Sequence, residues 1–564
     1  MATFSHEKYD SAGLLRLRAA AALKESPDLI ITGTRLLNIF SGALELRDIG
    51  VTSGRIAWTL PPGEAPSSMY ETTLHELNDG IAVPGLVEPH AHPELLYGPI
   101  ALSAAVVRHG TTTLCADLLT FTALLEDQDL LRLLEACEGG AARMMWALRA
   151  SAEGGGHLVE KLSASRLINL INQVPTIATI GEMTAWRELA NGDARLCELT
   201  NFALGRSKRI NGHLPGASVR SLQRAAVAGI TDDHEATTAD EAISRLDNGY
   251  WVMARHSTLR ADARRIVEGL LRQGRSLNRV MLTTDGPVAA DLVTGHLDRV
   301  IREVISAGVD PVDAIRMATI NPATYLGMDH QIGSLAPGRY ADIAVVSDLS
   351  EFRVESTLVG GIIPTQLPSY PHGLSTARIL GAEITGTTLR DIASNAPSVK
   401  LEGVLTRLQD DAGAHPALGV LVSKDGSWLT AITIANLELD ALASSYSGTG
   451  DIILIGQDFD LLAECYARLV QMGSGIVTPR KTLPLELLGT LSSRSVGELA
   501  ETVAEISKEI RMPGGLIPLE FLILFLGLGV LPELRLTPGG VLEVKSGKIL
   551  ADPISITRRK DGNL

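Results

Sequence analysis

Residues 80–94 read GIAVPGLVEPHAHPE, an apolar run followed directly by two histidines and two glutamates. The apolar part is typical of a buried strand. Burying imidazoles and carboxylates costs free energy unless something binds them. A lone His-x-His favours a polar loop at the mouth of a core strand, so a metal interpretation depends on ligands elsewhere in the chain.

From residue 81 onward the sequence alternates between an apolar strand, a polar loop and a helical stretch of ten or more residues. This alternation is typical of parallel strands joined by crossover helices. The strand candidates are IAVPGLVEPH (81–90), TTTLCADLL (111–119), RMMWALRAS (143–151), TIATIGEM (176–183), KRINGH (208–213), AGITDDH (228–234), GYWVMARHS (249–257) and RVMLTTDG (279–286). Eight such strands predict an α/β fold with a (β/α)8 TIM-like barrel over residues 81–332.

The segments on either side of the barrel have a different pattern. Residues 1–80 predict an N-terminal helix and then short strands separated by Gly, Asn and Ser turns. Residues 333–395 return to turn and strand chemistry, so we expect both flanks to build one small β-sandwich. Residues 396–564 mix strands with long helices, which predicts a C-terminal α+β domain.

Active sites of (β/α)8 barrels form at the C-terminal ends of the strands, so ligands from distant parts of the chain should meet there. Six candidates follow predicted strands one, four, five, six and eight: His90, His92, Glu182, His213, His234 and Asp285. Such a nitrogen and oxygen set suits borderline divalent metals. Glu182 could bridge two ions that share a hydroxide, because bound metals lower the pKa of water toward about 7. With Asp285 accepting its proton, such a site hydrolyses a polarised C–N bond.

Other side chains near the predicted strand ends are candidates for substrate contacts. Arg255 and His256 end strand seven, on the same rim. His157, in EGGGHL, is predicted to lie in a solvated loop, with a lid over the pocket as the alternative. Asp310, before Pro311, is predicted to cap a helix over residues 310–328.

Bulk composition narrows the class of protein. The 564 residues carry a net charge of −15, which argues against nucleic acid or an anionic membrane as partner. Four scattered cysteines fit a reducing cytoplasm. The charged N-terminus does not read as a secretion signal, and the apolar segment 521–531 is too short to span a bilayer. We expect a cytoplasmic enzyme that acts on a small-molecule substrate. It could form homo-oligomers, but the sequence identifies no interface.

The ordered motifs PGLVEPHAH, HGTTTLCAD, GEM, GHLPG, GITDDHEATT, TTDG and GSLAPGRYADIAVVSDL resemble the amidohydrolase superfamily, and within it the bacterial adenine deaminase family. The C-terminal LEFLILFLGLGVLPELRLTPGGVLEV is similar to that family's last segment. The resemblance implies two divalent ions (Mn, Fe or Zn) and hydrolysis of adenine, or a related 6-substituted aminopurine, to release ammonia. It also implies metal ligation by His90, His92, Glu182 as bridge, His213, His234 and Asp285. By the same likeness Asp285 accepts a proton, and Glu235 shuttles protons or binds substrate.

The chain departs from that family where loops face the substrate. After the first strand it keeps Glu94, a candidate substrate contact, but lacks the two serines that usually follow. ADLLTF replaces the usual Asp-Pro-His after strand two, and the C-terminal Ser-x-x-His-Asp-Ser-His stretch has no counterpart. Two alternatives therefore stay open: an amidohydrolase of another N-heterocycle or cyclic amide, and a catalytically silent binding homologue. The absence of a lysine at strand four disfavours the dihydropyrimidinase-like hydrolases.

Overall fold

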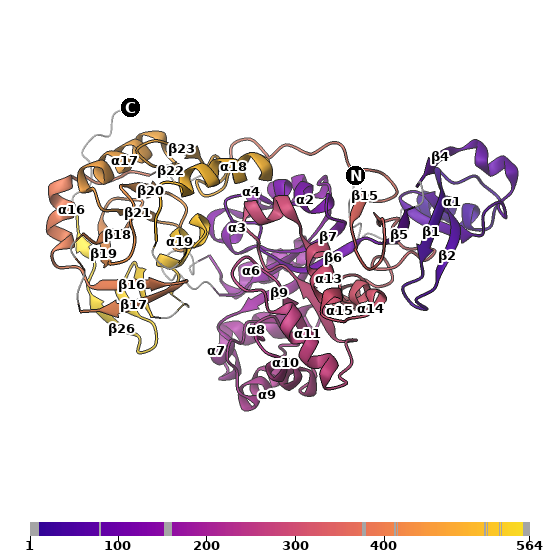
Figure 1. The fold of residues 1–564 in the computed structure, drawn as a ribbon, viewed down its shortest axis with the longest axis horizontal. Helices are drawn as coiled ribbons and strands as arrows, with labels where there is room; N and C mark the ends of the chain where they lie inside the picture. The colour runs from indigo at the N-terminus through magenta and orange to yellow at the C-terminus, as the bar shows by residue number, and fades with distance from the viewer. Residues whose placement is uncertain are drawn as a thin grey trace.

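The computed structural model describes residues 11–556, apart from residues 78–79, 152–160, 375–378, 411–412, 414, 513–514, 516, 530 and 532. Three parts lie in a row: an N-terminal sheet, a central barrel and a C-terminal domain (Figure 1). His157 lies outside the described residues.

Segments from both sides of the barrel join in one seven-stranded sheet with the order β15-β14-β5-β1-β2-β3 and β4 beside β1. β14 pairs antiparallel with β5, directly before the first barrel strand. The elements are α1 (Ser11–Ala21), β1 (Leu29–Leu37), β2 (Leu44–Thr52), β3 (Arg55–Leu60), a 3-10 helix (Ser67–Glu71), β4 (Thr73–Glu76), β5 (Ile81–Pro84), β14 (Ile343–Val346) and β15 (Val354–Leu358). The flanks are therefore one structural unit, as the sequence predicted.

Eight parallel barrel strands are present in the described part of the chain, in the predicted order. They are β6 (Leu86–Ala91), β7 (Thr111–Asp117), β8 (Arg143–Arg149), β9 (Ile177–Met183), β10 (Arg209–Gly212), β11 (Asp232–Asp233), β12 (Trp251–Arg255) and β13 (Val280–Thr283). β6 to β10 form one parallel sheet and β11 to β13 another. A parallel bridge between Ile210 and Ile230 joins the sheets, and β13 contacts β6 to close the ring.

Helices surround the barrel because each carries an apolar face toward the strands. In α11, Ala263, Ile266, Val267 and Leu270 are buried at helical spacing. The barrel helices are α2 (Pro99–Val107), α3 (Leu119–Leu124), α4 (Asp127–Glu138), α6 (Ala164–Gln173), α7 (Trp186–Ala190), α8 (Ala194–Leu204), α9 (Val219–Val227), α10 (Ala239–Asp247), α11 (Ala263–Arg272), α12 (Ala289–Thr294), α13 (Leu297–Ser306), α14 (Pro311–Met317) and α15 (Ile320–Tyr325).

The helix predicted over residues 310–328 is divided into α14 and α15. The Asp310 side chain caps α14 as predicted, accepting the Val312 and Asp313 N–H groups. Pro322 has no N–H to donate to the Ala318 carbonyl, which a continuous helix would require. That carbonyl instead accepts the Val87 N–H at 2.8 Å, which ties the break to β6.

The C-terminal domain is built on a nine-stranded sheet with the order β17-β16-β19-β18-β21-β20-β22-β23 and β27 beside β19, plus a three-stranded sheet, β24-β25-β26. Its elements are α16 (Gly386–Ala393), β16 (Ser398–Glu402), β17 (Leu405–Gln409), β18 (Ala417–Val422), β19 (Trp428–Ile434), β20 (Leu442–Ser444), β21 (Ile452–Gly456), α17 (Phe459–Met472), β22 (Gly475–Val477), β23 (Thr482–Pro484), α18 (Val496–Ser507), α19 (Leu519–Leu526), β24 (Leu534–Thr537), β25 (Gly540–Glu543), β26 (Lys548–Ala551) and β27 (Ile554–Ser555).

The predicted boundary at residue 395 is wrong for α16. Leu389 and Ile392 pack in the same apolar cluster as Leu462 and Leu469 of α17. The helix therefore belongs to the C-terminal core and not to the N-terminal sheet, because its apolar face finds its partner there.

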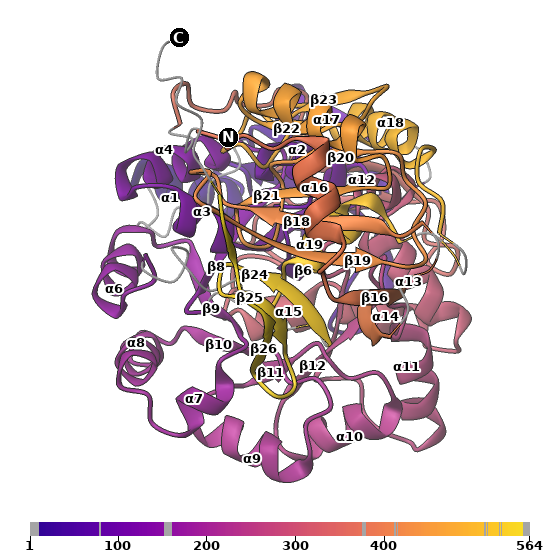
Figure 2. The same ribbon diagram turned by 90° about the vertical axis from the view of Figure 1, so that its left-hand side faces the viewer.

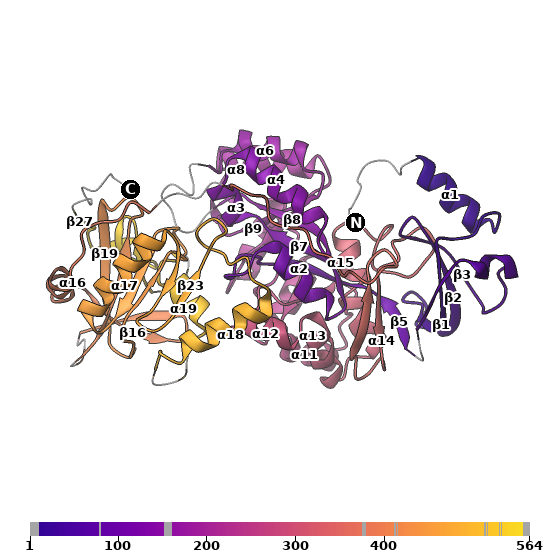
Figure 3. The ribbon, with the colours of Figure 1, turned by 90° about the horizontal axis from the view of Figure 1, so that it is seen from above.

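The C-terminal domain packs directly on the barrel (Figures 2 and 3). α18 contacts α12 and α2, and the Ser492 N–H donates to the Leu96 carbonyl at 2.6 Å. Leu96 follows the C-terminal end of β6, so this contact lies at the rim where the predicted ligands emerge. Among the described residues, no helix combines the length and apolarity needed to cross a membrane.

Candidate metal centre

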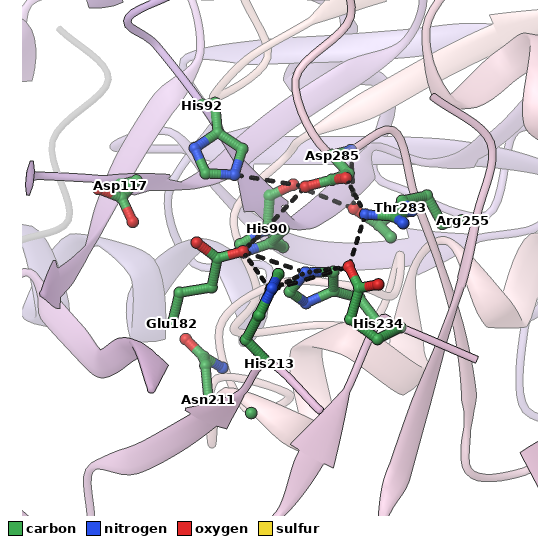
Figure 4. Close-up of polar contacts among 12 residues, drawn as sticks. His90, His92, Asp117, Glu182, Asn211, His213, His234, Arg255, Thr283 and Asp285 are labelled. Atoms are coloured by element: carbon green, nitrogen blue, oxygen red, sulfur yellow. Dashed lines mark hydrogen bonds and ion pairs between the residues drawn. The ribbon is translucent and has the colours of Figure 1, made fainter. Parts of the chain in front are cut away.

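The six predicted ligands converge at the C-terminal ends of the barrel strands (Figure 4). They form two groups that share Glu182, and within each group one possible ligand atom per residue lies within 4.8 Å of the others. The first group is His90, His92, Glu182 and Asp285; the second is Glu182, His213 and His234.

Local backbone structure brings Asp285 close to the two histidines of β6. Asp285 has a positive φ of 52°, and Gly286, with φ 79°, follows it. A Cβ at Gly286 would lie 2.8 Å from the His92 Cβ, which is too close for any larger residue. This sharp turn lets Asp285 Oδ1 lie 3.1 Å from His90 Nε2 and 3.3 Å from His92 Nε2.

One oxygen of Glu182 lies among three imidazoles. Oε1 is 3.1 Å from His213 Nδ1, 3.1 Å from His234 Nε2 and 3.8 Å from His90 Nε2. The rings of His90 and His234 stack with centroids 4.4 Å apart. Ring nitrogens from three strands therefore crowd around a single carboxylate oxygen.

A divalent cation fits this donor set better than protons do. Burial lowers the pKa of His234, but hydrogen bonds to Glu182 and Glu235 outweigh it and raise that pKa to about 10. Burial also lowers the pKa of His213, but the charge of Glu182 raises it overall. Two imidazolium rings would repel each other, because His213 Nδ1 and His234 Nε2 are only 3.4 Å apart. A cation bound by the same nitrogen and oxygen atoms removes that repulsion.

Arg255, the last residue of β12, connects the two carboxylates predicted to move protons. Its Nη1 lies 2.9 Å from Glu235 Oε1 and pairs closely with Asp285 Oδ2. Burial raises the pKa of Asp285, but the charge of Arg255 and hydrogen bonds from His90 and His92 hold it well below the usual value. Burial likewise raises the pKa of Glu235, but its hydrogen bond with His234 and the charge of Arg255 lower it to about 2.

Glu94 and His256, two predicted substrate contacts, differ in their surroundings. Glu94 Oε1 lies 3.0 Å from His92 Nδ1, so it orients the imidazole whose Nε2 faces Asp285. The charged groups near His256 are Arg299 and Glu303 of α13, Asp291 of α12 and Asp262 before α11. Its Nδ1 is buried and has no hydrogen-bond partner among the described residues. Successive side chains of a strand point to opposite faces, so Arg255 points toward the site and His256 toward the helices.

Glu88, two residues before His90, is a structural component that the sequence reading missed. Its Oε1 accepts the His90 N–H at 3.1 Å and Thr283 Oγ1–H at 2.6 Å. Its Oε2 accepts the Thr284 N–H at 2.9 Å and Thr284 Oγ1–H at 2.8 Å. The buried carboxyl therefore joins the end of β6 to the end of β13, where the two histidines and Asp285 emerge.

Arg149, the last residue of β8, was also missed. Its Nε donates to Asp117 Oδ2 at 2.7 Å, and its Nη2 pairs closely with Glu182 Oε2. The rule that identified the ligands, a polar residue at the end of a barrel strand, applies equally to Arg149 and Asp117. A search for metal-ligand residue types passes over the arginine.

The C-terminal domain brings two further polar side chains to the rim. Tyr446 and Glu520 are buried, and neither the Tyr446 hydroxyl nor Glu520 Oε1 has a hydrogen-bond partner among the described residues. Glu520 accepts the Ala289 N–H, four residues after Asp285. Burial raises the pKa of Glu520 to about 7.

Known proteins match this chain over most of its length. The amidohydrolase family profile matches residues 81–363, and the adenine deaminase C-terminal domain profile matches residues 422–548. A Bacillus cereus protein named "Putative adenine deaminase" is 31% identical over 569 residues, covering 95% of each chain. The adenine deaminase of Methanothrix thermoacetophila is 30% identical over 565 residues, covering 94% of this chain and 97% of its own. The adenine deaminase of Cenarchaeum symbiosum is 28% identical over 575 residues, covering 95% and 94%.

Proposed function

Because the chain belongs to the adenine deaminase family of the amidohydrolases, we propose that it deaminates adenine, or a related 6-substituted aminopurine, by metal-dependent hydrolysis. Family membership makes it a hydrolase of C–N bonds other than peptide bonds. The choice of substrate rests on the relatives. The reaction takes up one water and releases one ammonia.

We propose that two divalent ions, of Mn, Fe or Zn, are held by the two ligand groups that share Glu182. The observation that carries this proposal is the crowding of three imidazole nitrogens around Glu182 Oε1. Ions bound there would polarise the substrate and would lower the pKa of a water molecule toward about 7, which would supply the nucleophile.

The protein's own contribution is to position and exchange protons. We assign Asp285 to accept the proton of the attacking water and return it to the departing amine. Its Oδ1 faces His90 and His92, and Arg255 keeps the carboxylate ionised, the form that accepts a proton. Glu235 is the second carboxylate for proton transfer, since its Oε1 lies 3.3 Å from His234 Nε2.

The test is turnover by protein loaded with Mn, Fe or Zn. It is measured as ammonia release from adenine and other aminopurines, methylamine release from N6-methyladenine, and ring opening of cyclic amides. We expect turnover on adenine or another 6-substituted purine, together with two metal ions per chain. Turnover on cyclic amides alone would contradict the proposed substrate. Bound metal with no turnover on any compound would favour a binding homologue.

A further inference from the structure

We propose that Arg149 is a positioning residue that holds Glu182 Oε2 away from the metal centre, so that Glu182 offers cations one oxygen only. The inference rests on the metal site of the proposed function and concerns how tightly that site binds its ions. No step of the proposed reaction is changed by it.

Arg149 is fixed before any cation binds. Its Nε donates to Asp117 Oδ2 at 2.7 Å, and Asp117 Oδ1 in turn accepts the Leu119 N–H at 2.7 Å. Arg149 is 6% exposed, Asp117 1% and Glu182 5%. A guanidinium held this way is not screened by water and cannot turn away without leaving a charge buried and unpaired.

The two oxygens of Glu182 therefore have different roles. Oε2 pairs with Arg149. Oε1 lies among His90, His213 and His234 (Figure 4). Both ligand groups require Glu182, so two ions would have to share it. Because Oε2 pairs with Arg149, both ions would have to bind Oε1. Arg149 also neutralises part of the negative charge of Glu182 that would attract them.

This arrangement predicts unequal affinities for the two ions. A first ion would be held by Oε1 and nearby imidazole nitrogens, and a second ion would bind more weakly because the nearby guanidinium opposes its charge. Removing the guanidinium frees Oε2 and eliminates that repulsion, so the second ion should bind more tightly.

Arg143 provides a matched control on the same strand. It is 2% exposed and forms a buried ion pair with Asp342, with Nε to Oδ2 at 2.8 Å, at the opposite end of β8. Arg143→Met removes an equally buried guanidinium without altering the metal centre.

The experiment is a titration of metal-free protein with Mn²⁺, with free Mn²⁺ read from its electron paramagnetic resonance signal. Arg149→Met should tighten the weaker site by about tenfold or more, since one buried positive charge next to the shared carboxylate is lost. Arg149→Gln, which removes the charge but retains hydrogen bonding, should change it in the same direction. Arg149→Lys and Arg143→Met should remain close to wild type.

Circular dichroism checks folding, and if Arg149→Met does not fold, Arg149→Gln decides. An unchanged or weaker second site in the folded charge-removing variant overturns the inference, as does a wild-type chain that binds no Mn²⁺. The readout does not depend on turnover. If Mn²⁺ affinity changes as expected in the Arg149 variants but the wild-type protein releases no ammonia, the proposed substrate is refuted and the role of Arg149 is not.

Discussion

At the scale of single residues, Arg255 sets the charge of both carboxylates assigned to proton transfer. It lies between Asp285 and Glu235 and favours the ionised form of each. The two carboxylates can remain anionic side by side because the guanidinium offsets their repulsion. Both carboxylates are therefore held in the ionised form, which is the form that can accept a proton.

Asp285→Asn tests the proton-transfer role. The amide keeps an oxygen that can face His90 and His92 but cannot accept the proton. We expect kcat to fall at least about a hundredfold, the range for loss of a general acid–base group, while bound metal is retained. Ammonia release and metal content on the same preparation check this. Near-normal kcat would rule out the role.

At the scale of elements, the site depends on how β6 meets β13. Glu88 joins the two strand ends through three hydrogen bonds from Thr283 and Thr284, and it accepts a fourth from the His90 N–H of its own strand. Gly286 permits the close approach of the Asp285 turn to His92. The histidines of β6, the first barrel strand, and Asp285 after β13, the last, are thereby held in one ligand group. The geometry of that group depends on closure of the barrel.

Glu88→Gln tests this junction. The NH2 group of the glutamine would face hydrogen-bond donors that now bind a carboxyl oxygen of Glu88. We therefore expect the free energy of unfolding to fall by about 1–3 kcal/mol and the Mn²⁺ occupancy to fall as well. Asp342→Asn is the control, because Asp342 is also a buried acceptor, of the Gly360 N–H and Arg143, but lies away from the rim. It should cost stability and leave Mn²⁺ binding intact. Equal metal loss in both variants would refute a specific role for Glu88.

Gly286→Ala tests the close approach. The new Cβ would lie 2.8 Å from the His92 Cβ, and the positive φ adds strain of about 1 kcal/mol. We expect displacement of His92 and loss of metal affinity in Mn²⁺ titration. Gly274→Ala has the same kind of backbone strain, φ 61°, but a Cβ there meets nothing within 4 Å. The Gly274 variant should therefore lose only stability; matching Mn²⁺ curves for the two variants would contradict the steric argument.

At the scale of the whole molecule, the C-terminal domain contacts the two barrel loops that carry site residues. Leu96 and Tyr97 follow Glu94, and the Tyr97 hydroxyl donates to the Pro287 carbonyl at 2.6 Å, two residues after Asp285. Ser492 pairs with Leu96, and Glu520 accepts the Ala289 N–H. The C-terminal domain is therefore positioned to influence the rim through these loops.

Glu520 makes the stability of this arrangement depend on pH. Burial raises the pKa of its carboxyl from 4.5 to about 7 in the folded chain, so folding favours the protonated form. The Glu520 carboxyl does not change the stability below pH 4.5, and it lowers the stability as the pH rises toward 7, by up to roughly 3 kcal/mol. The glutamine of the Glu520→Gln variant cannot ionise. The stability of this variant relative to wild type should therefore rise between pH 4.5 and 7 and level off at higher pH.

Urea unfolding of both proteins at pH 5 and pH 8 checks this prediction. Glu501→Gln, an exposed position on α18, is the control and should track wild type at both values. A constant difference between Glu520→Gln and wild type at the two pH values would show that Glu520 does not titrate in this way.

The predicted fold and ligand set depended on patterns that are local in sequence. Each barrel strand is an apolar run of a few residues, and each candidate ligand stands at the end of one. The direction of His256, the packing of α16 and the break at Pro322 were not predicted. They depend on which face of a strand or helix meets which neighbour, and that is set by contacts between segments far apart in sequence.

The sequence by itself determined the order of strands and the residue types at their ends, because burial imposes a period on each segment separately. Barrel topology then converts that order into convergence at one rim. Only the tertiary structure decided that Arg149 pairs with Glu182 and that Arg255 pairs with both Asp285 and Glu235. It also decided that Glu88 joins β6 to β13. Charge pairing and hydrogen bonding act over a few ångströms in space, and closure of the barrel determines which side chains come within that distance.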